Sequence, residues 1–177
     1  MLADWRAELV SDRGVFSSGA VDPGTLELLR AGGRAPEDGS DLVDVGCGYG
    51  PIALTLAHRF PACTLWAVDI NKRAVELTGA NAQRLGLPNV RAVAPEAVPP
   101  EVRFAQIWSN PPIRVGKAAL HDLLTTWLAR LASGGEARLV VQRHLGSDSL
   151  AAWLRGEGYT VDRVGSKKGY RLLRVTR

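Results

Sequence analysis

The residues of this sequence that most directly indicate a chemical function are an asparagine and the two prolines after it. Asn110-Pro111-Pro112-Ile113 follows the apolar run 104–108. Because proline fixes its own φ and restricts the residue before it, the two prolines hold Asn110 rigidly at the end of a strand. The side-chain oxygen of Asn110 and the backbone carbonyl of Pro111 can then accept both N–H bonds of an amine, which makes its nitrogen a better nucleophile. The plain alternative is a strand-ending turn, since Asn-Pro commonly opens turns.

A second motif places an acid and three alternating glycines between a strand and a helix. Asp44-Val45-Gly46-Cys47-Gly48-Tyr49-Gly50 ends a short apolar run, and apolar residues recur at helical spacing after Pro51. Glycines let the backbone turn sharply and approach a ligand closely. A dinucleotide site is expected to show G-x-G-x-x-G, whereas here the third glycine comes one residue early. The acid before the loop suits the sulfonium and ammonium of S-adenosylmethionine (SAM) better than a pyrophosphate.

Acids also follow the next two strand-like runs. Asp69 ends the run 63–69, and Glu96 follows the run 90–94. An acid at the tip of the second strand of a βαβ unit can accept hydrogen bonds from both hydroxyls of a ribose, and Glu96 is expected beside an adenine amine. Each acid alone could be a surface residue or a helix cap, but their recurrence at three strand ends favours a cofactor site. The expected cofactor-binding residues are Asp44, Gly46, Cys47, Gly48, Tyr49, Gly50, Asp69, Ile70, Glu96 and Asn110.

Alternating strands and helices are expected to position these motifs. Apolar runs predict strands at 41–46, 63–69, 90–94, 104–109, 136–143, 159–164 and 170–176. Helical spacing and capping residues predict helices at 21–31, 51–60, 71–86, 117–133 and 147–157, with Asp22 capping the first. The alternation predicts an α/β, Rossmann-like fold whose mostly parallel sheet has helices on both faces. Only 165–169 separate the last two of the seven strands, so a hairpin with one antiparallel strand is expected.

The topology brings the motifs together. In an open α/β sheet, ligands bind beyond the carboxyl ends of the strands, near the point where the strand order reverses. The glycine loop, Asp69, Glu96 and Asn110 follow the first four strands and should therefore share one edge of the sheet.

Length and composition agree with one domain of this kind. The 177 residues, 46% of them hydrophobic, can bury one substantial core, and no apolar stretch is long enough to span a membrane. We therefore expect a soluble, cytoplasmic protein with no membrane partner. Cys47 and Cys63 are too few for a disulfide framework or a zinc ribbon, so no metal is expected. The net charge of +4 favours a polyanionic partner, although a mild basic excess also occurs in proteins that never bind nucleic acid.

Taken in order, these motifs resemble the class I SAM-dependent methyltransferases that modify exocyclic amines. More narrowly, the chain is similar to the small-domain group that contains the bacterial small-subunit ribosomal RNA guanine-N2 methyltransferases and their single-domain archaeal relatives. The resemblance runs from about Gly14 to Val175. It includes Val15-Phe16-Ser17 and Asp22-Pro23-Gly24-Thr25 near the start, Ser109-Asn110-Pro111-Pro112-Ile113-Arg114-Val115-Gly116-Lys117, and Lys168-Gly169-Tyr170-Arg171 near the end. The first and last of these segments are the ones that point to this group rather than to SAM enzymes in general.

The resemblance implies a function and a set of residues. It implies one methyltransferase domain over 1–177, in which 1–40 form a helical lead-in and a linker, and it implies SAM as the cofactor. The substrate is expected to be a guanine amine of RNA, presented in ribosomal RNA or a ribosomal subunit. The residues that match the family are catalytic at Asn110, Pro111, Pro112 and Ile113, and substrate-binding at Phe16, Arg114, Tyr170 and Arg171.

Some features leave alternatives open. Amino-methyltransferases commonly carry an aromatic residue where this chain has Ile113, so base stacking must be weaker or come from Phe16 or Tyr170. The bacterial ribosomal RNA enzymes also carry an extra RNA-engaging domain, whereas only the catalytic unit is expected here. Lys167 and Lys168 form either part of a basic rim for phosphates or a solvated turn. The alternative functions are a protein glutamine N-methyltransferase, which needs the same amine clamp, and a non-catalytic SAM-binding ribosome-assembly factor.

Overall fold

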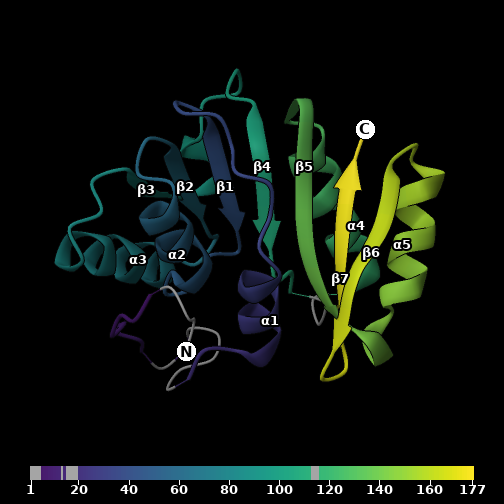
Figure 1. Ribbon diagram of the computed structural model, residues 1–177, viewed down its shortest axis with the longest axis horizontal. Helices are drawn as coiled ribbons and strands as arrows, with labels where there is room; N and C mark the ends of the chain where they lie inside the picture. Colours follow the sequence, from purple (N-terminus) through teal and green to yellow (C-terminus); the bar gives the residue numbers. More distant parts are fainter. Residues whose placement is uncertain (1–4, 13, 15–19, 113–115) are drawn as a thin grey trace.

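The computed structural model describes residues 5–12, 14, 20–112 and 116–177 and is built on one twisted sheet (Figure 1). The sheet has seven strands in the order β3-β2-β1-β4-β5-β7-β6. The strands are β1 (Asp41–Val45), β2 (Thr64–Val68), β3 (Val90–Val93), β4 (Phe104–Ser109), β5 (Leu131–Gln142), β6 (Thr160–Lys167) and β7 (Tyr170–Thr176). The helices are α1 (Pro23–Ala31), α2 (Pro51–Arg59), α3 (Lys72–Arg84), α4 (Lys117–Leu128) and α5 (Ser147–Gly156), with short 3₁₀ turns η1 (Pro95–Ala97) and η3 (Arg143–Leu145).

The strand directions confirm the predicted fold class. All neighbouring strands from β3 to β5 pair in parallel, and β7 runs antiparallel to both β5 and β6. The strand order reverses between β1 and β4, so the crevice beyond their carboxyl ends is where this class of sheet binds ligands. The glycine loop follows β1 and Asn110 follows β4, which puts both motifs at the reversal.

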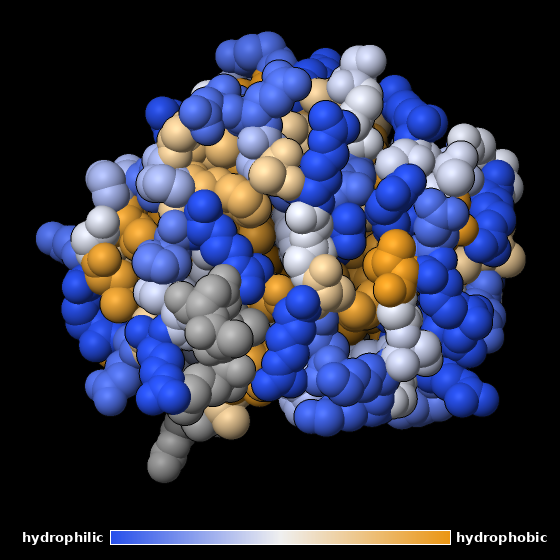
Figure 2. Space-filling model, viewed as in Figure 1, coloured by the Kyte–Doolittle hydropathy of each residue, from blue (hydrophilic) through white to orange (hydrophobic). Residues whose placement is uncertain are grey.

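Helices cover both faces of the sheet, as predicted (Figure 1). Helices α1 and α2 pack on one face around the fully buried Trp108, and α4 and α5 pack on the other around Phe104. The face seen in Figure 2 is dominated by hydrophilic side chains, with hydrophobic ones set between them. Among the described residues, no helix is long and apolar enough to cross a membrane.

Two expected helical segments are wrong. Residues 5–12 form no helix, because their backbone is held by other elements: Val10 N–H donates to the Asn81 side-chain oxygen at 2.9 Å, and the Asn81 amide donates to the Val10 carbonyl at 2.9 Å. The helix expected at 117–133 ends at Leu128, and β5 begins at Leu131. Leu131 continues the apolar stripe of the helix, but its side chain is buried beside β4, where it pairs with Phe104.

The closing hairpin is tighter than expected. Strand β6 continues to Lys167, with a bulge between Arg163 and Gly165, so only Lys168 and Gly169 connect it to β7. Both connecting residues have positive φ, 52° and 82°, as a two-residue type I′ turn requires. This short turn places Tyr170 at the first position of β7, opposite Gln142 at the carboxyl end of β5.

Candidate active site

The glycine loop is braced by the end of the neighbouring strand. Gly46, Gly48 and Gly50 all have positive φ, between 59° and 99°, which side chains rarely tolerate. The backbone N–H groups of Gly46 and Cys47 donate to the carbonyl of Val68 at 2.8 and 3.0 Å. The loop is therefore a rigid turn at the carboxyl end of β1.

Asp44 is a fully buried carboxylate beneath this loop. Its Oδ2 accepts a hydrogen bond from the Ala53 N–H at 3.0 Å, in the first turn of α2, whereas Oδ1 is buried without a partner among the described residues. Burial raises the pKa of Asp44 to about 8, the Ala53 N–H lowers it in part, and the charge of Asp69 raises it further. A buried acid with one unpaired oxygen fits a cation beside it, because a positive charge would stabilise its ionised form.

Asp69 keeps the acceptor capacity that a ribose needs. Its Oδ2 accepts from the Gly48 N–H at 3.0 Å and its Oδ1 accepts from the Asn71 N–H at 2.9 Å. Each carboxylate oxygen has two lone pairs, so both can still accept a hydroxyl. Ile70 is 87% exposed next to it, unlike most of the large apolar side chains among the described residues. Glu96 lies exposed on η1.

Two residues of the loop point their side chains into the protein. The Tyr49 side chain is buried with Ala74 and Leu77, and the backbone carbonyl of Tyr49 accepts from the Asn81 amide at 3.0 Å. The thiol of Cys47 is buried, and burial raises its pKa well above the ordinary value. Both residues are nevertheless among those that line the cavity beside Asn110.

The Asn110 amide is held in one orientation by α1. Its Nδ2 donates to Asp22 Oδ1 at 2.9 Å and to Thr25 Oγ1 at 3.0 Å. Both amide protons are bound, and no residue of the described part of the chain donates to the Asn110 side-chain oxygen. The Ser109 hydroxyl donates to the Val45 carbonyl at 2.7 Å, which ties the ends of β4 and β1 together. Of the next two residues, Pro111 is buried and Pro112 is exposed.

A small cavity separates Asn110 from the glycine loop. Its volume is about 30 Å³, and its described lining residues are Asp22, Thr25, Gly46, Cys47, Gly48, Tyr49, Pro51, Ile52 and Asn110. A larger cavity of about 670 Å³ lies beside it, between the N-terminal segment, α1 and α2, and shares Tyr49 and Pro51. Asp69 and Glu96 are not among the described lining residues of either cavity, but Asp69 is joined to the glycine loop by the hydrogen bond from the Gly48 N–H at 3.0 Å.

Of the four residues expected to bind substrate, the structure describes Tyr170 and Arg171, which point to opposite faces of the sheet. Tyr170 lies at the site, where its hydroxyl donates to Asp22 Oδ2 at 3.3 Å and accepts from the Gln142 amide at 3.2 Å. Because side chains alternate along a strand, Arg171 points to the other face, and its Nε lies 3.7 Å from Asp148 Oδ1. Phe16, Arg114 and the catalytic candidate Ile113 lie outside the described residues.

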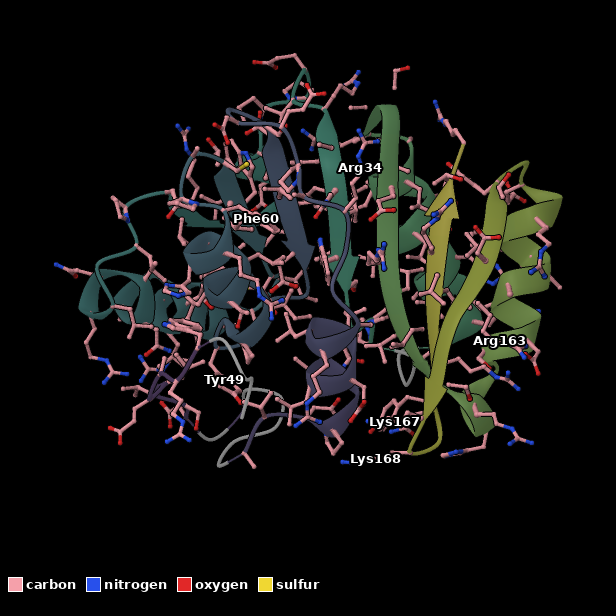
Figure 3. All side chains as sticks on the ribbon, in the orientation of Figure 1. Arg34, Tyr49, Phe60, Arg163, Lys167 and Lys168 are labelled. Atoms are coloured by element: carbon pink, nitrogen blue, oxygen red, sulfur yellow. The ribbon has the colours of Figure 1, made fainter. Side chains whose placement is uncertain are left out.

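Lys167 and Lys168 are ion-paired rather than freely solvated. Figure 3 shows both at the hairpin turn near α1, and their Nζ atoms lie 3.5 and 3.7 Å from the carboxylate of Glu27 on that helix. Burial raises the pKa of Glu27, but the hydrogen bond from Arg30 and the charge of Lys167 outweigh it and hold the pKa below its ordinary value. Both lysines remain largely exposed, so each can still meet a phosphate.

The sequence analysis missed Asp22, Thr25 and Gln142 as site residues. Asp22 was recognised as a helix cap, and it does accept from the Thr25 N–H at 3.0 Å. Its contact with Asn110 joins residues 88 positions apart, and no local pattern marks such a pair. Within the described part of the chain, no group of three or more His, Cys, Asp or Glu side chains is placed to hold a metal ion.

Comparison with known proteins relates the chain to methyltransferases. A family model described as the methyltransferase small domain matches residues 6–174. The uncharacterized protein YbxB of Bacillus subtilis (strain 168) is 39% identical over 168 residues, which are 93% of this chain and 83% of that protein. Ribosomal RNA small subunit methyltransferase C of Pseudomonas aeruginosa (strain LESB58) is 35% identical over 176 residues, 90% of this chain and 51% of that protein.

A solved structure is also similar over nearly the whole chain. It is the T. thermophilus 16S rRNA N2 methyltransferase RsmC in complex with AdoMet and guanosine, with a TM-score of 0.78 and 28% sequence identity. The match covers 93% of this chain and 45% of that one. The chain thus spans about half the length of these two ribosomal RNA methyltransferases.

Proposed function

Because the chain belongs to the methyltransferase small domain family and is a SAM-dependent methyltransferase, we propose that its methyl acceptor is an exocyclic amine, N2 of guanine in ribosomal RNA. The observation that carries the proposal is the Asn110 amide, which lines the cavity beside the glycine loop, has both protons bound by Asp22 and Thr25, and has no donor to its oxygen among the described residues. A turn residue has no need of such a fixed orientation.

The residues at the ends of β1, β2 and β3 suit SAM. Asp44 would lie near its cationic groups, Asp69 would accept from the ribose hydroxyls, and Ile70 and Glu96 would face the adenine. SAM supplies a methyl group on a positively charged sulfur, which a nucleophile attacks in line.

Asn110 and Pro111 would prepare the amine for this attack. The two N–H bonds donate to the Asn110 side-chain oxygen and the Pro111 carbonyl, so the nitrogen lone pair points at the methyl carbon. Most of the acceleration then comes from positioning, and no strong base is needed before transfer. The methylated nitrogen afterwards loses one proton to solvent.

An RNA substrate agrees with the names of the relatives and with the charge of the chain. Two of the similar proteins are named ribosomal RNA methyltransferases, and the net charge is +4. A paired guanine cannot present its amine in line, so the base must come from a single strand or be flipped out. We further propose that residues 1–177 act as one methyltransferase domain, that the reaction is cytoplasmic and that it needs no metal.

Transfer of tritiated methyl from SAM to total RNA and to total protein tests this function. We expect label in RNA, and Asn110→Ala should abolish most of it. Label in protein alone would instead support a glutamine side-chain acceptor. The absence of label in both, with intact SAM binding, would support a non-catalytic SAM-binding factor.

A further inference from the structure

A chain of hydrogen bonds leads from the far strands of the sheet to Asn110. The Gln142 amide on β5 donates to the Tyr170 hydroxyl on β7 at 3.2 Å, and that hydroxyl donates to Asp22 Oδ2 at 3.3 Å. The other oxygen of Asp22 accepts from Asn110 Nδ2 at 2.9 Å and from the Thr25 N–H at 3.0 Å. Two carboxylate oxygens thus join α1, β4 and β7.

Among the described residues, Asp22 is a partner of the Asn110 amide that is compatible with only one of its two orientations. A carboxylate only accepts hydrogen bonds, so it can face the NH₂ of an amide but not its oxygen. A flipped amide would put two oxygens about 2.9 Å apart at the distance of this hydrogen bond. The Thr25 hydroxyl, which lies 3.0 Å from Nδ2, can donate or accept and would tolerate either orientation.

The hairpin holds Asp22 in place. The ring of Tyr170 lies against the first turn of α1, and a Cβ built on Gly24 would come within 2.5 Å of Tyr170 Cε1. Only a glycine at this position lets the ring approach closely enough for its hydroxyl to reach Asp22. Lys167 and Lys168 of the same hairpin form ion pairs with Glu27, which lies one turn farther along α1.

We infer that Asp22 is a positioning residue for methyl transfer, which directs the Asn110 oxygen toward the substrate amine, and that Tyr170 supports it from the hairpin. The inference rests on the amine-clamp role proposed for Asn110. It assigns Tyr170 a place behind the clamp, in addition to the substrate contact that its sequence motif implies. It also gives a reason for the contact between Asp22, the N-cap of α1, and Tyr170, the first residue of β7, next to Asn110.

Substitutions at Asp22 can separate this role from helix capping. Serine is as good an N-cap as aspartate, but its hydroxyl can donate as well as accept, so like the Thr25 hydroxyl it tolerates either orientation of the Asn110 amide. Asp22→Ser should therefore lower kcat by about 10- to 100-fold, less than the roughly 10²–10³-fold loss of a preorganised group that touches the reacting atoms, because Asp22 acts through Asn110. The Kd for SAM should stay within about twofold of wild type. Asp22→Asn keeps an acceptor oxygen at the correct reach and should recover most of kcat.

A double-mutant cycle tests whether Asp22 acts through Asn110. If it does, adding Asp22→Ser to Asn110→Ala lowers kcat no further than Asn110→Ala alone, within about twofold. Tyr170→Phe should lower kcat by a few-fold, and Tyr159→Phe, the same change at a tyrosine packed against the core away from the site, should not. Multiplying losses in the cycle, or full kcat in Asp22→Ser, would overturn the inference. Full activity of Asn110→Ala would instead overturn the proposed function.

Discussion

The pH dependence of stability gives a sharp test of the buried acid under the glycine loop. Asp44 is wholly inaccessible to solvent, one of its oxygens has no partner among the described residues, and burial raises its pKa from 3.8 to about 8. At a pH between these two pKa values, Asp44 keeps its proton in the folded protein and releases it in the unfolded chain. The contribution of Asp44 to stability is therefore complete below about pH 4 and is lost as the pH rises toward 8.

The size of the effect follows from the same shift. Each pH unit inside this window costs at most about 1.4 kcal/mol of unfolding free energy. From pH 5 to pH 7, Asp44 should thus destabilise the SAM-free protein by up to about 3 kcal/mol, as an upper limit. Asp44→Asn keeps the shape and the acceptor for the Ala53 N–H but cannot ionise, so it should not show this loss.

Urea unfolding of wild type and Asp44→Asn at several pH values measures the difference. The stability of the variant relative to wild type should rise steadily between pH 5 and pH 7. Curves that run parallel over this range would refute a strongly raised pKa. Since a cation near Asp44 favours its ionised form, SAM binding to wild type at pH 6 to 7 should also release a proton. Calorimetry in two buffers of different ionisation enthalpy detects that proton, and Asp44→Asn should lack it.

Three further predictions concern single contacts. Asp69→Ala should weaken SAM binding by roughly 1.5–3 kcal/mol, because it removes a charged acceptor and the brace on the Gly48 N–H; unchanged affinity by calorimetry would contradict the ribose contact. Gly24→Ala should push the Tyr170 ring off α1 and lower kcat more than Gly79→Ala, where a Cβ meets nothing closer than 3.8 Å; equal kcat in both would show that the close approach is unimportant. Lys167→Gln with Lys168→Gln should raise the KM for RNA and reduce its salt dependence by a slope of about 1 to 2, with SAM binding unchanged; an unaltered salt slope would exclude phosphate contacts from the turn.

Neutral substitutions at Lys167 and Lys168 are preferable to acidic ones because of the neighbouring Glu27. Both lysines face the buried Glu27, so an acid at either position would stand against a like charge and loosen the hairpin itself. A loss of RNA binding would then not report on phosphate contacts alone.

Local patterns were enough to predict the parts of the site that follow each strand. Three glycines after β1, an acid near the end of β1 and an acid directly after β2 need only their own neighbours to be recognised, and the sheet order then gathers them at one edge. The family resemblance drawn from these motifs is confirmed by the match over residues 6–174. The specific site roles of these residues stay predictions.

The sequence could not predict contacts between side chains that lie far apart along the chain. The pairing of Asp22 with Asn110 depends on where α1 packs against the sheet, and the helix-cap pattern around Asp22 is satisfied with or without it. The resemblance grouped Tyr170 and Arg171 together as substrate residues, although alternation within the strand predicted at 170–176 already implies that their side chains point to opposite faces of the sheet. The end of α4 was missed because Leu131 suits a helical stripe and a buried strand equally well.

Identification of the methylated nucleoside tests the central claim most directly. Ribosomal RNA is incubated with wild-type protein and SAM that carries a trideuterated methyl group, then digested to nucleosides and analysed by mass spectrometry against reference compounds. We predict label in N2-methylguanosine, and loss of at least about 99% of it with Asn110→Ala, on the scale of one removed preorganised group. Label on a ribose hydroxyl or a ring nitrogen, or equal N2 labelling by Asn110→Ala, would contradict an exocyclic-amine clamp built on Asn110.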